Sequence, residues 1–289
     1  MSPVRRIQQE HGIVGRGAEL RRCLAVLGAG RNLLLEGPVG VGKTTVALAV
    51  CRHLGRRTVR VDGDERFTES RMTGWFDPPL VLQKGYGEES FFPGPLVQAM
   101  RDGSVLFINE MNRMPETVQN VLLPALDERL LVLPRLGELA AAAGFLVVAT
   151  QNPVEYIATG HLSEALRDRF EQVALAYQDE VEERDIVARD TGGADSELIA
   201  LAVAIVRMTR VHDKIRKGAS VRAAAGIVKL ALALAGMGDG ARGADPTDDA
   251  VLREAALTAL ATRVELKDEE GADLAAVVAE IVASVKKKS

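Results

Sequence analysis

The most constraining feature of this sequence is a glycine-rich turn between a short apolar run and a helical pattern. The run Leu33–Leu35 is typical of a buried parallel strand. The residues from Gly37 to Thr44 match the pattern G-x-x-x-x-G-K-T, and the apolar spacing up to Leu54 predicts a helix. Such glycines let backbone N–H groups turn towards phosphate oxygens, and the helix start adds its positive end. This context predicts a nucleoside triphosphate site.

Residue types within this P-loop indicate individual roles. Lys43 is expected to reach the β- and γ-phosphates, and the Thr44 hydroxyl is expected to ligate Mg²⁺. The alternative is a glycine-rich turn with a chance Lys-Thr pair, and the complete match argues against it. The predicted nucleotide-binding residues of this stretch are Gly37, Pro38, Val39, Gly40, Val41, Gly42, Lys43, Thr44 and Thr45.

Bulk composition restricts the class of protein. The 36 basic and 40 acidic side chains leave a net charge of −4, which argues against a dedicated nucleic-acid binder. Cys23 and Cys51 are too few for a disulfide framework, and Cys51 is expected to pack as a small apolar residue. No apolar run is long enough for a membrane span, and the N-terminus lacks an apolar signal segment. We therefore expect a cytoplasmic protein.

Apolar patterns predict further strands and helices around the P-loop. Strands alternating with helices favour an α/β fold with a parallel sheet flanked by helices. Residues 62–96 have weak periodicity, which is typical of a functional loop or an inserted element. The strands are expected at Thr58–Val61, Val105–Ile108, Leu130–Leu133, Phe145–Thr150 and Phe170–Tyr177. A hairpin through Gly137 is expected to join the strands at 130–133 and 145–150. Helices are expected at Ala18–Leu27 and at Pro115–Glu128, and Pro124 is expected to kink the helix at 115–128.

The pattern changes after residue 177. From there only helices are predicted, and we expect an α/β nucleotide-binding domain at 1–177 and a small all-helical lid domain at 178–289. The predicted helices are Glu180–Arg189, Asp195–Val211, Ser220–Gly236, Asp248–Leu266 and Asp268–Lys286.

Polar residues follow two of the predicted strands. Glu110 and Asn152 each come just past a strand, and ligand sites in parallel sheets gather at the carboxyl ends of strands. Glu110 could polarise the water that attacks the γ-phosphate, and Asn152 could position that water. The alternatives are a helix-capping acid for Glu110 and an Asx-turn before Pro153 for Asn152.

Arginines supply a further signal. Ser220 is a good N-cap, so Arg222 falls in the first turn of a long helix, where the macrodipole disfavours a cation by about 0.3–1 kcal/mol. That cost is explained if Arg222 reaches a phosphate. Either Arg167 or Arg169 is expected to project into a neighbouring subunit's nucleotide. For all three, a solvated surface arginine is the alternative interpretation.

The order of these pieces resembles the MoxR-type AAA+ ATPases over residues 14–265. The resemblance rests on the P-loop, Asn109-Glu110, Ala149–Pro153, Asp168–Phe170 and Gly218–Arg222. It implies a sensor 1 strand between the two Walker strands, an insert at 76–95 and a hairpin at 130–146. It also implies roles for single residues, with Glu110 as the Walker B glutamate, Asn152 as sensor 1, Arg169 as the arginine finger, Arg222 as sensor 2 and Val14 in the nucleotide site.

The resemblance also implies an activity and partners. Members are Mg²⁺-dependent ATPases that form hexameric rings and remodel or activate another protein complex, for example during metal-cofactor insertion, with a von Willebrand factor A domain adaptor. The stretch Asp64–Pro78 is similar to the branch that serves molybdenum-containing carbon monoxide dehydrogenase.

One position departs from the family pattern. Asn109 stands where the usual Walker B pair has an aspartate that holds Mg²⁺, largely through water. An amide oxygen can accept a hydrogen bond from that water, but the negative charge is missing. We therefore expect weaker Mg²⁺ binding and slow turnover. Two alternatives remain open: a nucleotide-gated scaffold with little turnover, and a DNA-directed AAA+ motor.

Overall fold

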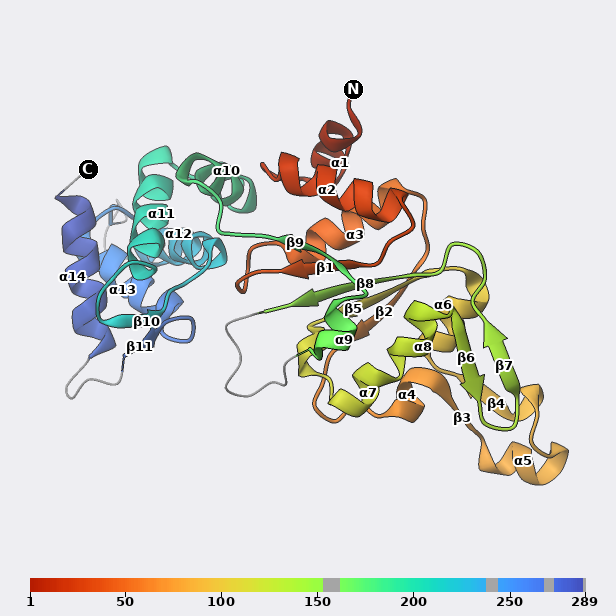
Figure 1. Ribbon diagram of the computed structural model, residues 1–289. Coiled ribbons are helices and arrows are strands. Elements are labelled where there is room, and N and C mark those ends of the chain that lie inside the picture. The colour runs from red at the N-terminus through yellow and green to blue at the C-terminus, as the bar shows by residue number, and fades with distance from the viewer. Residues whose placement is uncertain (153–161, 238–243, 268–272, 288–289) are drawn as a thin grey trace. The chain divides into compact units, whose positions relative to one another are not determined.

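The computed structural model describes residues 1–152, 162–237, 244–267 and 273–287. The chain forms two compact units, Met1–Ala176 and Tyr177–Ser289, each with its own hydrophobic core (Figure 1). Pro153 of the predicted strand-end motif lies outside the described residues, as do the first residues of the helix expected from Asp268.

A five-stranded parallel sheet with the order β2-β5-β8-β1-β9 organises the first unit. The strands are β1 (Leu33–Glu36), β2 (Thr58–Asp62), β5 (Val105–Asn109), β8 (Leu146–Gln151) and β9 (Glu171–Ala174). Every neighbouring pair runs parallel, so all carboxyl ends lie at one edge. The predicted parallel sheet is confirmed, and β8 lies between β1 and β5 as the resemblance implied.

Helices cover both faces of this sheet (Figure 1). The helices of this unit are α1 (Pro3–His11), α2 (Gly17–Gly28), α3 (Lys43–His53), α4 (Glu69–Thr73), α5 (Pro78–Lys84), α6 (Pro95–Asp102), α7 (Glu116–Asn120), α8 (Leu122–Asp127) and α9 (Glu164–Arg167), of which α5 belongs to an insert and does not cover the sheet. Leu34 packs in one buried cluster with α6 and α8, whereas the alternating Leu33 and Leu35 face the opposite side, towards α2 and α3. The predicted kink is confirmed, because Pro124 has no N–H to donate to residue 120 and the helix breaks between α7 and α8.

The segment between β2 and α6 is an inserted element. It contains α4, α5 and an antiparallel hairpin of β3 (Gly74–Phe76) and β4 (Phe91–Pro93). The Phe76 ring lies 5.2 Å from Phe91 and 5.0 Å from Tyr86 between centroids. Aromatic contacts of this kind stabilise a short hairpin that has little sheet of its own.

One predicted strand pairing is wrong. β6 (Leu130–Leu133) pairs antiparallel with β7 (Gly137–Ala140), and not with the segment 145–150, which forms β8 of the central sheet. Every residue of β8 is buried, as is typical of a strand with neighbours on both sides. The hairpin expected at 130–146 from the resemblance is confirmed.

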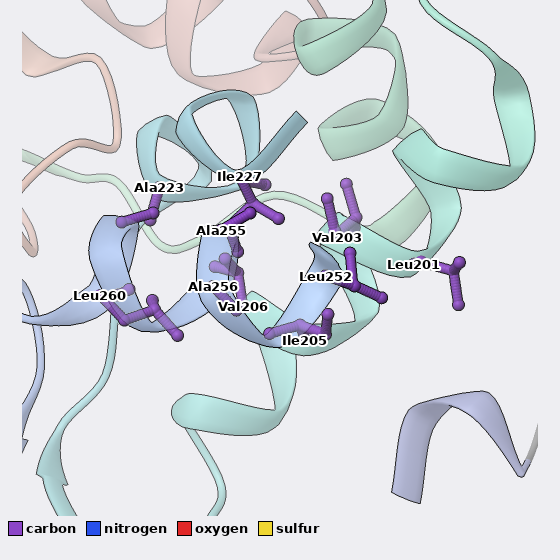
Figure 2. Close-up of a cluster of buried hydrophobic side chains, with 14 of the residues drawn as sticks. Leu201, Val203, Ile205, Val206, Ala223, Ile227, Leu252, Ala255, Ala256 and Leu260 are labelled. Carbon is purple, nitrogen blue, oxygen red and sulfur yellow. The ribbon is translucent and has the colours of Figure 1, made fainter. Parts of the chain in front are cut away.

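The second unit is mainly helical. Its helices are α10 (Glu180–Asp190), α11 (Ser196–Thr209), α12 (Val221–Gly236), α13 (Asp249–Leu260) and α14 (Leu274–Lys286). Side chains of α11, α12 and α13 fill its core, where alanines such as Ala223 and Ala256 allow close helix packing (Figure 2). No helix among the described ranges is both long and apolar enough to cross a bilayer.

The prediction that this unit has no strands is wrong. β10 (Ile215–Lys217) pairs antiparallel with β11 (Glu265–Leu266). The helix expected to continue to Leu266 therefore ends at Leu260, because pairing with β10 requires an extended backbone at residues 265–266.

A buried carboxylate stabilises the loop before α12. Glu183 is 1% exposed and accepts from Arg207 at 3.1 Å and Arg210 at 2.7 Å. Arg210 also donates to the Ala219 carbonyl at 2.8 Å, and its guanidinium lies 3.9 Å from the Tyr177 ring centre. The loop is therefore attached to α10 and α11 through one guanidinium.

Replacing Glu183 by alanine should be costly, because Arg210 would stay buried without its carboxylate. We expect Glu183→Ala to lower the free energy of unfolding by about 3–5 kcal/mol, measured by urea denaturation. The matched control is Arg184→Ala, which removes an exposed pair with Glu180 and should cost about 0.5 kcal/mol or less. Equal effects of the two substitutions would contradict this account.

Both cysteines are buried and free, as expected for Cys51. Burial raises the pKa of Cys23 to about 12 and that of Cys51 to about 11, so the thiolate is scarce near neutral pH. We expect neither thiol to react with a disulfide reagent at about pH 8 until denaturant is added. Rapid stoichiometric labelling of the folded protein would show that this packing is wrong.

Candidate functional site

The carboxyl ends of four parallel strands bring polar residues to one edge of the sheet. Asp62 at the end of β2 lies opposite Asn109 at the end of β5. Glu36 at the end of β1 lies opposite Gln151 of β8, and Asn152 follows directly. The candidate site is this edge together with the P-loop that leaves β1.

The P-loop connects β1 to α3 through a backbone that only glycine accommodates easily. Gly40 and Gly42 have φ angles of 80° and 89°, in the left-handed region. A Cβ atom at Gly37 would lie 2.1 Å from the Leu175 carbonyl oxygen, so the start of the loop packs directly against the chain leaving β9. The turn is thus held in a curled form suited to phosphate.

An arginine outside the motif holds the same loop. The Arg16 guanidinium donates to the Val41 carbonyl at 3.1 Å and the Ala176 carbonyl at 2.6 Å, and pairs with Glu19 at 3.0 Å. Arg16 is 7% exposed and has a left-handed φ of 60°. This residue was not predicted from the sequence, because nothing in the local pattern connects it with a loop 25 residues later.

The Lys43 side chain folds back into the P-loop that precedes it. Its ammonium donates to the carbonyls of Gly37 at 2.7 Å and Pro38 at 2.9 Å. A positive charge therefore sits among the inward-facing groups of the turn. This arrangement suits an anion carrying several negative charges.

The Asn109 amide is the centre of a hydrogen-bond network. Its Oδ1 accepts from the Thr44 hydroxyl at 2.9 Å and the Thr150 hydroxyl at 3.0 Å, while its Nδ2 donates to Asp62 Oδ1 at 3.0 Å. Thr150 Oγ1 in turn accepts from the Glu110 N–H at 2.9 Å. The predicted metal residues Thr44 and Asn109 are therefore in direct contact.

Asp62 places a carboxylate beside Asn109 at this edge. The Arg60 guanidinium beside it and the Asn109 amide hold the pKa of that carboxyl below its usual value. Thr44, Asn109 and Asp62 present a hydroxyl, an amide oxygen and a carboxylate, which are hard oxygen donors of the type that Mg²⁺ prefers. The donor chemistry fits magnesium.

The residues predicted to act on water lie at the same edge. Glu110 adopts a left-handed φ of 55°, a strained conformation for a side chain of this kind, directly after β5. Its carboxylate accepts from Arg113 at 3.0 Å and is 39% exposed. Asn152 is 4% exposed and comes directly after β8, the strand between β5 and β1.

The predicted arginines are placed differently. Arg169 forms a two-pronged ion pair with Asp127 of α8, at 2.8 and 2.9 Å, whereas Arg167 is exposed. Arg222 is exposed in the first turn of α12, in the second unit. Ser220 occupies the N-cap position, but its side chain makes no capping hydrogen bond. Val14 lies in the half-buried turn before Arg16.

Two further members of the network, Thr150 and Asp62, were not among the predicted site residues. Thr150 stands in the same predicted motif as Asn152, two residues before it. Asp62 follows the strand predicted at Thr58–Val61. Because polar residues past parallel strands meet at one edge, the position of Asp62 indicates this site in the same way as that of Glu110.

Comparison with known proteins finds a matching family and several relatives of this chain. Residues 32–170 match the family described as AAA domain (dynein-related subfamily). The gas vesicle ATPase GvpN of Haloferax mediterranei is 28% identical, over 86% of this chain and 74% of that protein. The same-named protein of Ancylobacter aquaticus is 28% identical over 73% of this chain, and the alignment spans 63% of that relative's length. An uncharacterized protein of Staphylococcus saprophyticus is 31% identical, over 70% of this chain and 78% of that protein.

A solved structure shows the same fold. The RuvB Holliday junction branch migration motor of Thermotoga maritima superposes with a TM-score of 0.52 at 17% sequence identity. The match covers 86% of this chain and 70% of that one. At this identity the likeness concerns the fold alone.

Substitutions at Thr150 test the hydrogen-bond network around Asn109. Thr150→Val keeps the shape but leaves the Glu110 N–H without its acceptor, so the free energy of unfolding should fall by about 1–3 kcal/mol. Thr150→Ser keeps the hydroxyl and should restore most of that loss. Urea denaturation of both variants checks this, and equal stability of Thr150→Val and the wild type would contradict the network.

Proposed function

This chain belongs to the MoxR-type AAA+ ATPases, and from that premise we propose that it hydrolyses ATP with Mg²⁺ and uses the energy to remodel or activate a partner protein complex. The observation that carries the proposal is the contact of P-loop Thr44 with Asn109 at the end of β5. That contact brings a phosphate cradle, oxygen donors and Glu110 together at one sheet edge.

The first group of residues would bind the nucleotide. Backbone N–H groups of the P-loop, from Gly37 to Thr45, would surround the phosphates, and Lys43 would leave its carbonyl contacts to reach the β- and γ-oxygens. Val14 would contact the nucleotide beside Arg16. Thr44 would ligate Mg²⁺, and Asn109 would accept a hydrogen bond from Thr44 or from a metal-bound water. Bound Mg²⁺ would neutralise charge that develops on the phosphates.

The second group would act on water. Glu110 would polarise the attacking water, since its backbone is held by Thr150 and its carboxylate is partly exposed. Asn152 would orient the same water through its amide. Exchange of Arg113 for water at the Glu110 carboxylate would be a condition for that step.

Arginines would complete the site in an assembled ring, for which we propose six subunits. Arg169 is positioned by Asp127, and Arg167 is exposed four residues before β9, so either could reach a neighbouring subunit's nucleotide. Arg222 would close over the γ-phosphate from the helical unit. Its exposed position in the first turn of α12 supports a role outside its own core.

The client is proposed to be a protein complex, reached through an adaptor with a von Willebrand factor A domain, in the cytoplasm. Metal-cofactor insertion is one such task. A scaffold with little turnover is the second candidate, and the observation that favours it is Asn109, which carries no charge next to Thr44. A DNA-directed motor is disfavoured by the net charge of −4.

Phosphate release tests these candidates. The wild type should release phosphate from ATP only when Mg²⁺ is present, and Glu110→Gln should bind ATP normally while turnover falls by about 10²–10⁴-fold. ATP binding without turnover in the wild type would favour the scaffold. Strong stimulation by DNA would replace the protein-remodelling proposal with a DNA-directed motor.

A further inference from the structure

Asn109 lacks the charge expected at the end of β5, and a carboxylate stands beside it on the next strand. Asp62 lies directly opposite Asn109 in the parallel register of β2 and β5. We infer that Asp62 is a positioning residue that turns the Asn109 amide oxygen towards Thr44 at the proposed Mg²⁺ site. This inference rests on the proposed Mg²⁺-dependent nucleotide site.

Hydrogen-bond chemistry fixes the orientation of the amide. An ionised carboxylate can only accept, so Asp62 Oδ1, at 3.0 Å, selects the NH₂ group of Asn109. The amide oxygen must then point the other way, where it accepts from Thr44 and Thr150. A flipped amide would place oxygen against carboxylate and would turn its NH₂ group towards the proposed cation.

Asp62 itself is held in place. Its side chain is 59% exposed, so it needs a partner to keep one orientation, and Arg60 provides it with contacts of 2.7 Å to Oδ1 and 3.1 Å to Oδ2. The Arg60 guanidinium lies 6.0 Å from the Phe107 ring centre on the neighbouring strand. Arg60, Asp62 and Asn109 thus form a chain of contacts that ends at Thr44.

The arrangement is an aspartate–asparagine pair spread over two strands. Asn109→Asp alone would bring two carboxylates together where the amide and Asp62 now lie 3.0 Å apart. Exchanging both residues, in the double variant Asp62→Asn with Asn109→Asp, restores one donor and one acceptor across the same register. The pair, rather than either residue alone, should therefore determine the response to Mg²⁺.

The test measures binding rather than activity. A fluorescent ATP analogue is titrated with Mg²⁺ against the full chain, and the Mg²⁺ concentration at half-maximal binding is recorded. Asp62→Ala should raise that midpoint by about tenfold, as is typical when a residue that orients a metal ligand is removed. The matched control is Asp64→Ala, which removes an exposed carboxylate two residues after the end of β2 and should leave the midpoint within about twofold of the wild type.

Thermal denaturation shows whether Asp62→Ala is folded. If it is not, the double variant Asp62→Asn with Asn109→Asp, the exchanged pair, provides the test. It should return the midpoint to the wild-type value or below. A midpoint for Asp62→Ala equal to that of Asp64→Ala, or an exchanged pair as weak as Asp62→Ala, overturns the inference. If the wild type binds no analogue, or binds it without regard to Mg²⁺, the proposed function itself fails, which is a different result.

Discussion

The parallel register of the central sheet is the constraint on which the site of the first unit depends. Strand order β2-β5-β8-β1 places Asp62, Asn109, Thr150 and the P-loop at successive positions along one edge. A slip of one residue in the β5–β8 or the β8–β1 pairing would turn the alternating side chains to the other face and separate Asn109 from Thr44. Full burial of β8, the middle strand of the five, makes such a slip costly.

The P-loop is attached to this sheet from several directions. Arg16 reaches it from the turn before α2, the Leu175 carbonyl packs against Gly37, and Thr44 bonds to the end of β5. These contacts come from segments far apart in the chain. A preformed cradle needs less ordering when the nucleotide binds, which favours affinity.

Asn109 shows how the structure changes the meaning of a departure from the family pattern. In the sequence it is a missing charge, and slow turnover is the simple consequence. In the structure the amide makes three hydrogen bonds, one of them to a carboxylate on the next strand. A carboxylate paired with Arg60 therefore orients the amide from the next strand, and whether turnover is slow stays a prediction.

The sequence by itself determined the parallel sheet, the P-loop and the broad change to helices after residue 177, because hydrophobic periodicity and glycine spacing are local signals. It also pointed to Glu110 and Asn152, since polar residues past parallel strands share an edge. Only the tertiary structure decided the partner of β6, the β10-β11 pairing, the bond of Arg169 to Asp127, and the roles of Arg16 and Thr150. Each of these depends on contacts between residues distant in sequence, which no local pattern records.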